Sequence, residues 1–385
     1  MQASQNITPV SQIADLHAAR GIAAAIVLFH HISLVHQTNM TTRLTLDTVL
    51  NAHGAVIFFF VLSGYVLTAS MVRSGVTRVT VMQFITRRAF RIYPALIAAF
   101  VLALAVWALG EPAGQGDKTG WYIRYSDRFF ESEMSWLEVL QNLIPVSFVA
   151  NPPTWSIFTE LVGSACIPLI VFWFRRGTGF MVAGLALFLV LSAIFVGKSG
   201  GFHYLNFMVF FALGAVVFFH NPLIRLTRPV LWGLAGSAAV ALLLCRMVYK
   251  VLVFGEMSPI EVYNSDWVMA LLEGGFAMVL IACLAAPQWR NNTLRMPAIL
   301  GDYSYSIYLM HFPMIWLAVW LSAEIPALSS DSATIAVFWI GIPALTFAAA
   351  GLSFRFLEKP AIRAGRVVSA KLATGTFASA RPVTS

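Results

Sequence analysis

Long, continuously apolar runs dominate the chain, and each is long enough to cross a membrane as a helix. A spanning helix needs about 20 mostly apolar residues. Reading for such runs predicts ten spans, namely 17–36, 54–72, 92–110, 154–174, 177–197, 200–219, 229–249, 267–287, 298–322 and 332–354. The runs do not alternate between apolar and polar residues, which favours helices over the strands of a barrel. The pattern therefore predicts an all-α, polytopic membrane protein, a bundle of about ten transmembrane helices.

Composition supports this fold class and excludes a soluble one. The 385 residues are 59% hydrophobic and 11% charged, whereas soluble proteins carry about 25% charged residues. Three cysteines, Cys166, Cys245 and Cys283, lie in apolar runs at no metal-like spacing. We read them as buried, inert thiols and expect no bound metal.

The distribution of basic residues predicts the orientation of the bundle. Lys and Arg collect on the cytoplasmic side of membranes. With a cytoplasmic N-terminus, eighteen of the 25 basic residues fall inside; the other seven are Arg43, Lys118, Arg124, Arg128, Lys198, Arg246 and Lys250. Both termini are therefore expected to lie in the cytoplasm. The protein itself is expected in the plasma (bacterial inner) membrane. The net charge of +8 is then mostly an insertion signal and does not favour nucleic-acid binding.

The spans divide the chain into three parts. Residues 1–16 lack the basic start of a signal peptide and form a short cytoplasmic segment. Residues 17–360 form one transmembrane domain, whose long outer loop, 111–153, contains the amphipathic stretch "MSWLEVLQNLIPV". That stretch is typical of a helix lying along the membrane surface. Residues 361–385 are expected to be a disordered cytoplasmic tail.

Ionisable residues inside the spans are candidates for function, because each is costly to bury. Arg20 and His31 are eleven residues apart, so they share a helical face roughly 16 Å apart along the axis, while His30 is turned about 80° away. By the same rise, Glu160 lies about 9 Å and His31 about 8 Å below the outer surface. These depths predict an acid–base pair. Glu273 lies at a comparable depth, and which carboxylate assists His31 stays open.

Other polar positions suggest a second site at the cytoplasmic end. In "RRAFRIYP", Arg88 and Arg91 stand at i and i+3 and together can grip a phosphate. Glu358 falls at the same end. Further polar residues with a supporting or acceptor-binding role are Ser63, Ser156, Glu273, Tyr308 and His311. For Ser63-Gly64 in mid-helix, close helix packing is the favoured interpretation.

Six short motifs resemble those of the acyltransferase-3 family of integral membrane O-acyltransferases. In order, they are "RGIAAAIVLFHH", "FFFVLSGYVL", "RRAFRIYP", "NPPTWSIFTE", "YSYSIYLMHFP" and "RFLEKP". Each motif is weak alone, but six in the family's order, over residues 20 to 360, are specific.

The resemblance implies transfer of an acyl group, usually acetyl, from cytoplasmic acyl-CoA to a hydroxyl of an extracytoplasmic glycan or lipid-linked saccharide. Acyl-CoA would be a co-substrate, with no permanently bound cofactor. By position, Arg20 and His31 match the family's Arg–His pair, with His31 as the catalytic base. Arg88 and Arg91 match its Arg-x-x-Arg at the acyl-CoA. The remaining matches are Trp155, Ser156 and Glu160 to its Trp-Ser-x-x-x-Glu, and Glu358 to its Glu-Lys-Pro.

Other functions remain open at the level of sequence. A secondary transporter or flippase would suit ten helices with buried His and Glu, although no repeated pair of broken helices points to a transport site. A haem or metal protein using His17, His31 and His311 is disfavoured because their spacing matches no metal motif. The acyl group (acetyl or succinyl), the acceptor, direct transfer or an acyl-enzyme intermediate, and the oligomeric state all stay undetermined.

The predicted topology can be tested by cysteine labelling. A membrane-impermeant thiol reagent applied to intact cells should modify a cysteine introduced at Ser126, in the outer loop, but not one at Thr178. Labelling at Thr178 would refute the predicted orientation.

Overall fold

The computed structural model describes residues 14–36, 40–110, 129–130, 135–144, 146–196, 203–254, 267–287, 298–328 and 330–373. Within these ranges the regular structure is helical and contains no strand. The longer helices are α1 (Ala14–Val35), α3 (Ala52–Ser74), α4 (Arg78–Trp107), α7 (Thr154–Phe174), α8 (Thr178–Phe195), α9 (Met208–Phe219), α10 (Arg228–Phe254), α11 (Trp267–Leu284), α12 (Ala298–Glu324), α14 (Ile342–Ser353) and α15 (Lys359–Ala373). The shorter ones are α2 (Met40–Val49), α6 (Trp136–Leu143), α13 (Asp331–Ala336), η2 (His203–Phe207), η3 (Pro222–Arg225) and η5 (Pro326–Leu328).

Ten helical segments in the described part are long and apolar enough to span a membrane. They coincide with the ten predicted spans, which confirms the all-α polytopic fold. The last one, 331–372, is a single helical run interrupted by two π-helical turns, η6 (Val337–Gly341) and η7 (Phe354–Glu358).

Helix α4 begins well before the predicted span at residue 92. The hydroxyls and amides of Thr77 and Thr80 form a reciprocal capping box that starts the helix, and such a cap satisfies donors that a helix start leaves unpaired. Pro94 is accommodated inside the helix. Arg88 and Arg91 therefore lie within a continuous helix.

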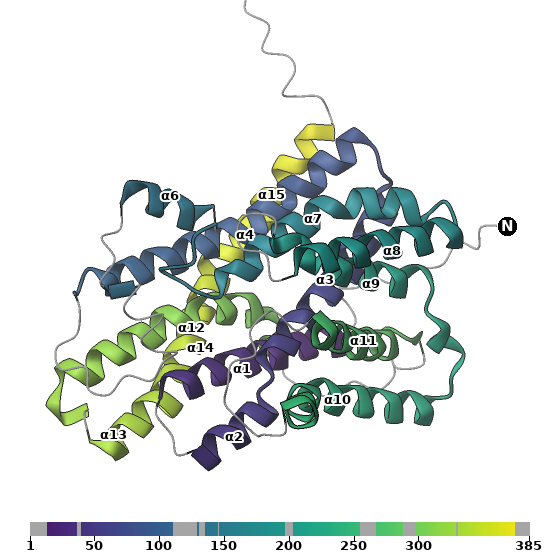
Figure 1. Ribbon diagram of the computed structural model, residues 1–385. Helices are drawn as coiled ribbons and strands as arrows, with labels where there is room; N and C mark the ends of the chain where they lie inside the picture. Colours follow the sequence, from purple (N-terminus) through teal and green to yellow (C-terminus); the bar gives the residue numbers. More distant parts are fainter. Residues whose placement is uncertain are drawn as a thin grey trace, which may run out of the picture.

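The chain after residue 360 differs from the expectation of a disordered tail. Residues 359–373 form α15, which packs along α4, and both helices extend past the others at the top of Figure 1. The buried positions of α15 are Gly365 and Ser369, the first of which packs against Phe90 of α4. These residue types do not predict a packed helix from the sequence. Residues 374–385 lie outside the described part.

Glycines allow two pairs of helices to approach closely. A Cβ added to Gly64 of α3 would lie 2.2 Å from the Phe211 carbonyl oxygen, and one added to Gly214 of α9 would lie 2.0 Å from that of Val61. Such small-residue contacts drive helix association in membranes. This confirms the packing interpretation for Gly64.

A second close contact aligns α1 with α12. A Cβ on Gly301 would lie 2.4 Å from the His17 carbonyl oxygen. His17 bonds Asp302 near the start of both helices, and His31 meets His311 further along both. The two helices therefore run parallel, with their polar residues in register.

Helix α7 starts in the interior of the bundle rather than at its surface. The Asn151 side-chain amide donates to the Leu309 carbonyl at 2.9 Å, in the middle of α12. Asn151 and Thr154 are both buried. Ser156 and Glu160, on the first turns of α7, are consequently held deep among the other helices.

The outer-loop stretch expected to be amphipathic forms α6. Ser135 and Glu138 cap it reciprocally, Trp136 is 85% exposed and Asn142 is buried. The other parts of 111–153, namely 111–128 with Ser126, 131–134 and 145, lie outside the described residues. The location of the loop outside the membrane stays a prediction.

Candidate functional site

A cavity of about 590 Å³ lies among α1, α3, α4, α7, α12, η7 and α15. Residues from both ends of the chain meet in it, since α1 and α15 both supply side chains. Eight residues selected from the sequence line it, namely Arg20, Ser63, Arg88, Arg91, Ser156, Glu160, Tyr308 and Glu358. The sequence divided these residues between an outer acid–base pair and a cytoplasmic site. They meet in one cavity only through the tertiary structure, because they come from six different segments.

Arginines outnumber carboxylates in this cavity. The lining includes five arginines, Arg20, Arg87, Arg88, Arg91 and Arg366, against three carboxylates, Glu160, Asp302 and Glu358. Within the described residues, no hydrogen bond or ion pair joins the guanidinium of Arg20 or Arg91 to a neighbour. An uncompensated cation in an apolar interior is costly. The cavity is therefore suited to an anionic ligand.

Arg88 is the exception, because it pairs with Glu160. Its Nη2 bonds the Glu160 carboxylate, and its Nε donates to Ser164 Oγ at 3.2 Å. Ser63 Oγ donates to the same carboxylate at 3.4 Å. Glu160 thus links α3, α4 and α7 at the wall of the cavity.

This arrangement corrects the predicted pair of Glu160 and His31. The predicted depth of Glu160 was counted from the outer membrane surface, because α7 was expected to start at that surface. Because α7 starts beside the middle of α12, Glu160 lies deeper and meets Arg88. Hydropathy alone cannot show that the segment leading into α7 is buried in the bundle.

Glu358 lies in the cavity wall rather than at a membrane boundary. Its side chain is 2% exposed and accepts a hydrogen bond from Ser306 Oγ of α12, which lies 2.9 Å from Ser353 Oγ. The π-helical turn η7 ends at Glu358, and such turns recur at functional sites because they redirect a side chain. Here the turn places a carboxylate among the arginines.

Ser156 and Tyr308 join α7 to α12 at another part of the wall. The two hydroxyl oxygens are 2.7 Å apart, and the Tyr308 hydroxyl lies 3.2 Å from the Pro153 carbonyl oxygen. The ring of Phe59 packs edge-on against that of Tyr308. Ser156, Tyr308 and Phe59 all line the cavity.

His31 lies just beyond this wall and is paired with His311. His31 Nδ1 and His311 Nε2 are 3.1 Å apart, and the two rings are stacked with centroids separated by 5.1 Å. The ring of His311 also contacts that of Tyr308. Neither histidine is among the residues that line the cavity. The partner of His31 is thus a second imidazole, where the sequence suggested a carboxylate.

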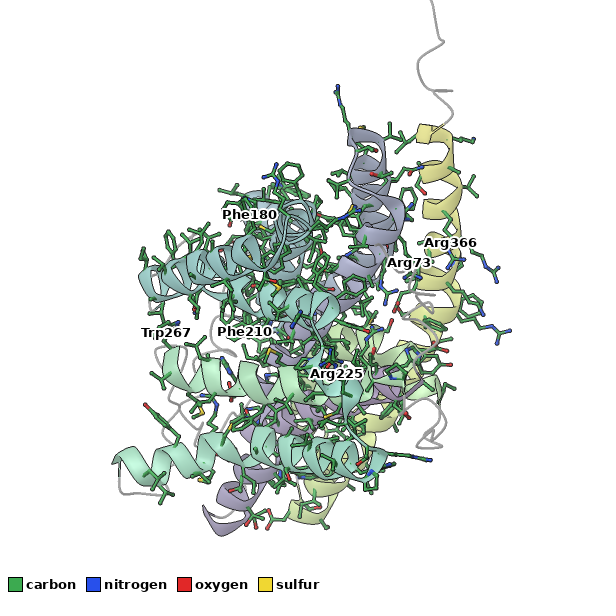
Figure 2. All side chains as sticks on the ribbon, turned by 90° about the vertical axis from the view of Figure 1, so that its right-hand side faces the viewer. Arg73, Phe180, Phe210, Arg225, Trp267 and Arg366 are labelled. Carbon is green, nitrogen blue, oxygen red and sulfur yellow. The ribbon has the colours of Figure 1, made fainter. Side chains whose placement is uncertain are left out.

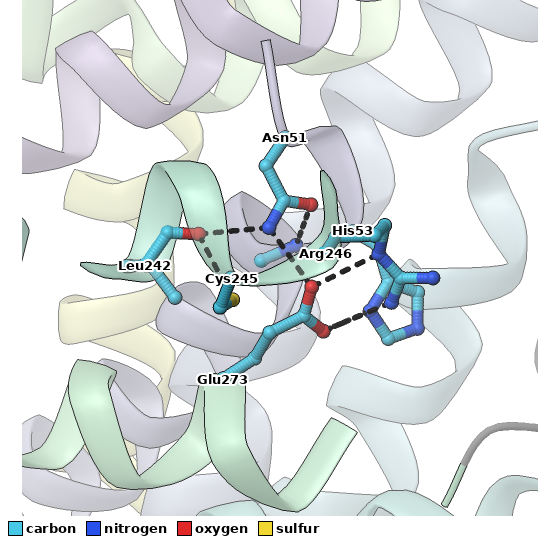
Figure 3. Close-up of polar contacts among 7 residues, drawn as sticks. Asn51, His53, Leu242, Cys245, Arg246 and Glu273 are labelled. Atoms are coloured by element: carbon cyan, nitrogen blue, oxygen red, sulfur yellow. Dashed lines mark hydrogen bonds and ion pairs between the residues drawn. The ribbon is translucent and has the colours of Figure 1, made fainter. Parts of the chain in front are cut away.

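Glu273, the other carboxylate considered for His31, belongs to a separate buried cluster (Figure 3). Arg246 Nε and Nη2 donate to its two oxygens at 3.0 and 3.1 Å, and His53 Nδ1 donates to Oε2 at 2.5 Å. Asn51 Nδ2 donates to Oε1 at 2.9 Å and to the Leu242 carbonyl at 2.8 Å. The side chain of Glu273 is completely buried.

These contacts assign Glu273 to helix packing rather than to His31. Its partners come from α10 and from the start of α3, so the cluster ties α3, α10 and α11 together. Asn51 also caps α3 by accepting from the Gly54 amide. Glu273 is absent from the lining of the cavity, which corrects the suggestion that it competes with Glu160 for the imidazole.

Trp155 is also outside the cavity. Its ring packs against Phe60 of α3 and Phe207 of η2, with centroids at 6.2 and 5.2 Å. It therefore holds the first turn of α7 in place.

Sequence reasoning did not assign Arg87, Arg366 and Asp302 to the site, and it considered His17 only as a metal ligand. Figure 2, which shows the right-hand side of Figure 1, labels Arg366 beside α15. Arg366 could not be found because the segment was expected to be disordered. His17 Nε2 lies 2.9 Å from Asp302 Oδ1, and the "GDYS" start of α12 was the one available signal.

Comparison with known proteins gives two matches. The family model described as "Acyltransferase domain", of the acyltransferase-3 type, matches residues 13–356. The chain is also similar to Nodulation protein 10 of Rhizobium leguminosarum bv. viciae, with 25% identity over 347 residues, which cover 82% of this chain and 84% of that protein. No solved structure matches.

The Glu273 cluster generates a prediction about stability. Glu273→Gln should lower the thermal unfolding midpoint of the detergent-solubilised protein, because Arg246 loses its counter-charge. The cost should be on the order of 3 kcal/mol, the lower end for a broken buried pair, since the Arg246 side chain is 19% exposed. The measurement is a thermal melt alongside activity per mole of folded protein, which should stay close to the parent value.

A double variant provides the control. Replacing both Glu273 and Arg246 with Met should recover part of the lost stability, because no unpaired charge remains. Loss of activity at an unchanged melting temperature would contradict a packing role for Glu273.

Proposed function

Because this chain belongs to the acyltransferase-3 family of membrane acyltransferases, we propose that it transfers an acetyl group from cytoplasmic acetyl-CoA to a hydroxyl of a cell-surface glycan or lipid-linked saccharide. The cavity would receive the donor. The family membership establishes a multi-pass membrane acyltransferase; the donor, the acceptor and the orientation are the proposal.

The observation that carries the proposal is the excess of arginines over carboxylates in the cavity, two of them without a direct hydrogen bond or ion pair in the described part of the chain. Coenzyme A bears a diphosphate and a ribose phosphate, whose oxygens match the fork of an arginine side chain. Arg20 and Arg91 line the cavity with no ion pair in the described part of the chain. Phosphates bound there would provide the counter-charge that these guanidinium groups lack.

Dimensions support a path from the phosphates to the histidine pair. Arg20 and His31 are separated by roughly 16 Å along α1. The pantetheine arm of coenzyme A is a chain of about twelve bonds that extends to roughly 15 Å. With the diphosphate at Arg20 and Arg91, the thioester would lie beside Ser156 and Tyr308, next to the ring of His311.

The histidine pair supplies the acid–base chemistry of the proposal. Acyl transfer to an alcohol requires a base that titrates near neutral pH, and an imidazole meets this requirement. His31 would take the proton from the acceptor hydroxyl as its oxygen attacks the thioester carbonyl. Glu160 would keep Arg88 in place at the donor, acting through that arginine.

The arrangement of basic residues supports a cytoplasmic entrance for the donor. In the predicted topology the protein lies in the bacterial inner membrane. The ends of α1 and α4 that carry Arg20 and Arg88 then face the cytoplasm. Acyl-CoA cannot cross a bilayer because it is a polyanion. The acceptor would then approach His31 from the opposite end.

The arginine site can be tested by donor binding. Arg91→Ala should weaken acetyl-CoA binding to the purified protein at least tenfold, because a charge-assisted hydrogen bond contributes about 1.5–3 kcal/mol. Isothermal titration of acetyl-CoA into the detergent-solubilised protein measures this. Arg228→Ala, at an exposed arginine outside the cavity lining, is the matched control and should bind acetyl-CoA normally. An Arg88/Arg91 double variant that folds and keeps parental affinity would refute the proposal.

The assignment of the base can be tested with adjacent residues. His31→Ala should lower acylated product about 10²–10⁴-fold, the usual effect of losing a general base. His30→Ala should retain most activity, because its ring is turned from the shared face of α1. The measurement is product per mole of membrane-inserted protein. An active His31 variant together with an inactive His30 variant would invert the assignment.

A further inference from the structure

The hydrogen bond between His31 and His311 bears on which ring nitrogen of His31 carries the proton. We propose that His311 is a positioning residue that holds His31 in the Nδ1–H tautomer and leaves the lone pair of His31 on Nε2, where it can accept the proton of the acceptor hydroxyl. The inference rests on the proposed function, since it concerns how the base of that reaction is oriented.

The tautomer of His311 follows from its second nitrogen. His311 Nδ1 lies 3.3 Å from the Ile307 carbonyl oxygen, one turn earlier in α12. A carbonyl oxygen can only accept, so Nδ1 carries the proton. The lone pair of the neutral ring is then on Nε2.

The tautomer of His31 follows in turn. His31 Nδ1 is 3.1 Å from His311 Nε2, and a hydrogen bond needs one donor. Because His311 Nε2 has the lone pair, His31 Nδ1 must donate. Charging either ring in an apolar interior is costly, so both rings are neutral and the lone pair of His31 is on Nε2.

Packing keeps the pair in this geometry. His311 is completely buried. The ring of Phe312 lies against both imidazoles, with centroids 5.0 Å from His31 and 5.2 Å from His311. A fixed acceptor of this kind plays the part that a carboxylate plays for the base in many hydrolases and transferases, namely orienting the ring.

The geometry favours positioning over proton relay. A proton that reached His311 Nε2 would leave His311 as a buried imidazolium ion, because its Nδ1 is already protonated. The Nδ1 proton faces the Ile307 carbonyl, which cannot take it up, so a proton on His311 could go no further and would have to return to His31. The proton therefore stays on His31 until the leaving group receives it.

The transfer step then balances with His31 alone. The acceptor oxygen forms a bond to the thioester carbonyl carbon while its proton moves to His31 Nε2. The carbon–sulfur bond breaks, and the sulfur takes the proton from Nε2. The products are the acyl ester and free coenzyme A, and His31 returns to its starting tautomer.

Two amide substitutions separate positioning from mere packing. In His311→Gln the amide oxygen falls near the position of Nε2 and can accept from His31 Nδ1–H. In His311→Asn the shorter side chain places its amide near the position of Nδ1, so it keeps a partner at Ile307 but does not reach His31. His311→Leu removes both contacts.

The assay uses inside-out vesicles from host cells that carry each variant, supplied with radiolabelled acetyl-CoA. His311→Asn and His311→Leu should lower kcat on the order of 10²-fold or more, as expected when a base loses its orienting partner. His311→Gln should stay within about tenfold of the parent. The KM for acetyl-CoA should change less than about twofold in all three, because His311 does not line the donor cavity.

The outcomes distinguish this inference from the proposed function. A parent protein that transfers no label from acetyl-CoA would refute the proposed function itself. An active parent with a Gln variant as impaired as Asn, at equal melting temperatures, would overturn the role of His311. Three variants at parental kcat would overturn it equally. If the Leu variant fails to insert, the comparison of Gln with Asn still decides.

Discussion

The high cost of a charge in hydrocarbon is the constraint on which the rest of this structure depends. Of the 385 residues, 59% are hydrophobic. Each buried charge must therefore meet an opposite charge, a hydrogen-bond partner or a ligand. Glu273 satisfies this requirement within the protein, through Arg246, His53 and Asn51. Arg20 and Arg91 share their cavity with Glu160 and Glu358 but form no direct hydrogen bond or ion pair among the described residues. This distinguishes the cavity from a structural ion-pair cluster.

Close helix contacts place these charges where they can act together. Gly64 and Gly214 bring α3 against α9, and Gly301 brings α12 against α1. The second contact sets the register of two parallel helices, so that His17 faces Asp302 and His31 faces His311. A larger side chain at Gly301 would clash with His17 of α1, so one of the two helices would have to move. Packing of small residues, which carries no chemistry itself, thus positions the polar pairs.

Two irregularities in the helices matter for the site. Helix α7 starts inside the bundle, where Asn151 bonds the backbone of α12, and this brings Glu160 to Arg88. The π-helical turn η7 turns Glu358 inward to Ser306. Irregular backbone is tolerated at membrane depth only where it is buried in protein or lines a cavity. Both irregularities here meet that condition, and each delivers a carboxylate to the arginine-rich wall.

The fold class, the ten spans and eight of the residues that line the cavity could be predicted from the sequence alone. Hydrophobic run length depends only on bilayer thickness, and buried ionisable residues are rare enough to be conspicuous, so Arg20, Arg88, Glu160 and Glu358 could be selected without a structure. The helical period also placed Arg20 and His31 on one face. Which polar groups contact one another could be learned only from the tertiary structure. His31 pairs with His311, Glu160 with Arg88 and Glu273 with Arg246, because these contacts depend on where each helix starts and how closely its neighbours approach. Neither quantity is encoded in the hydropathy of a single segment, and the same holds for α15, whose helix is stabilised by packing against α4.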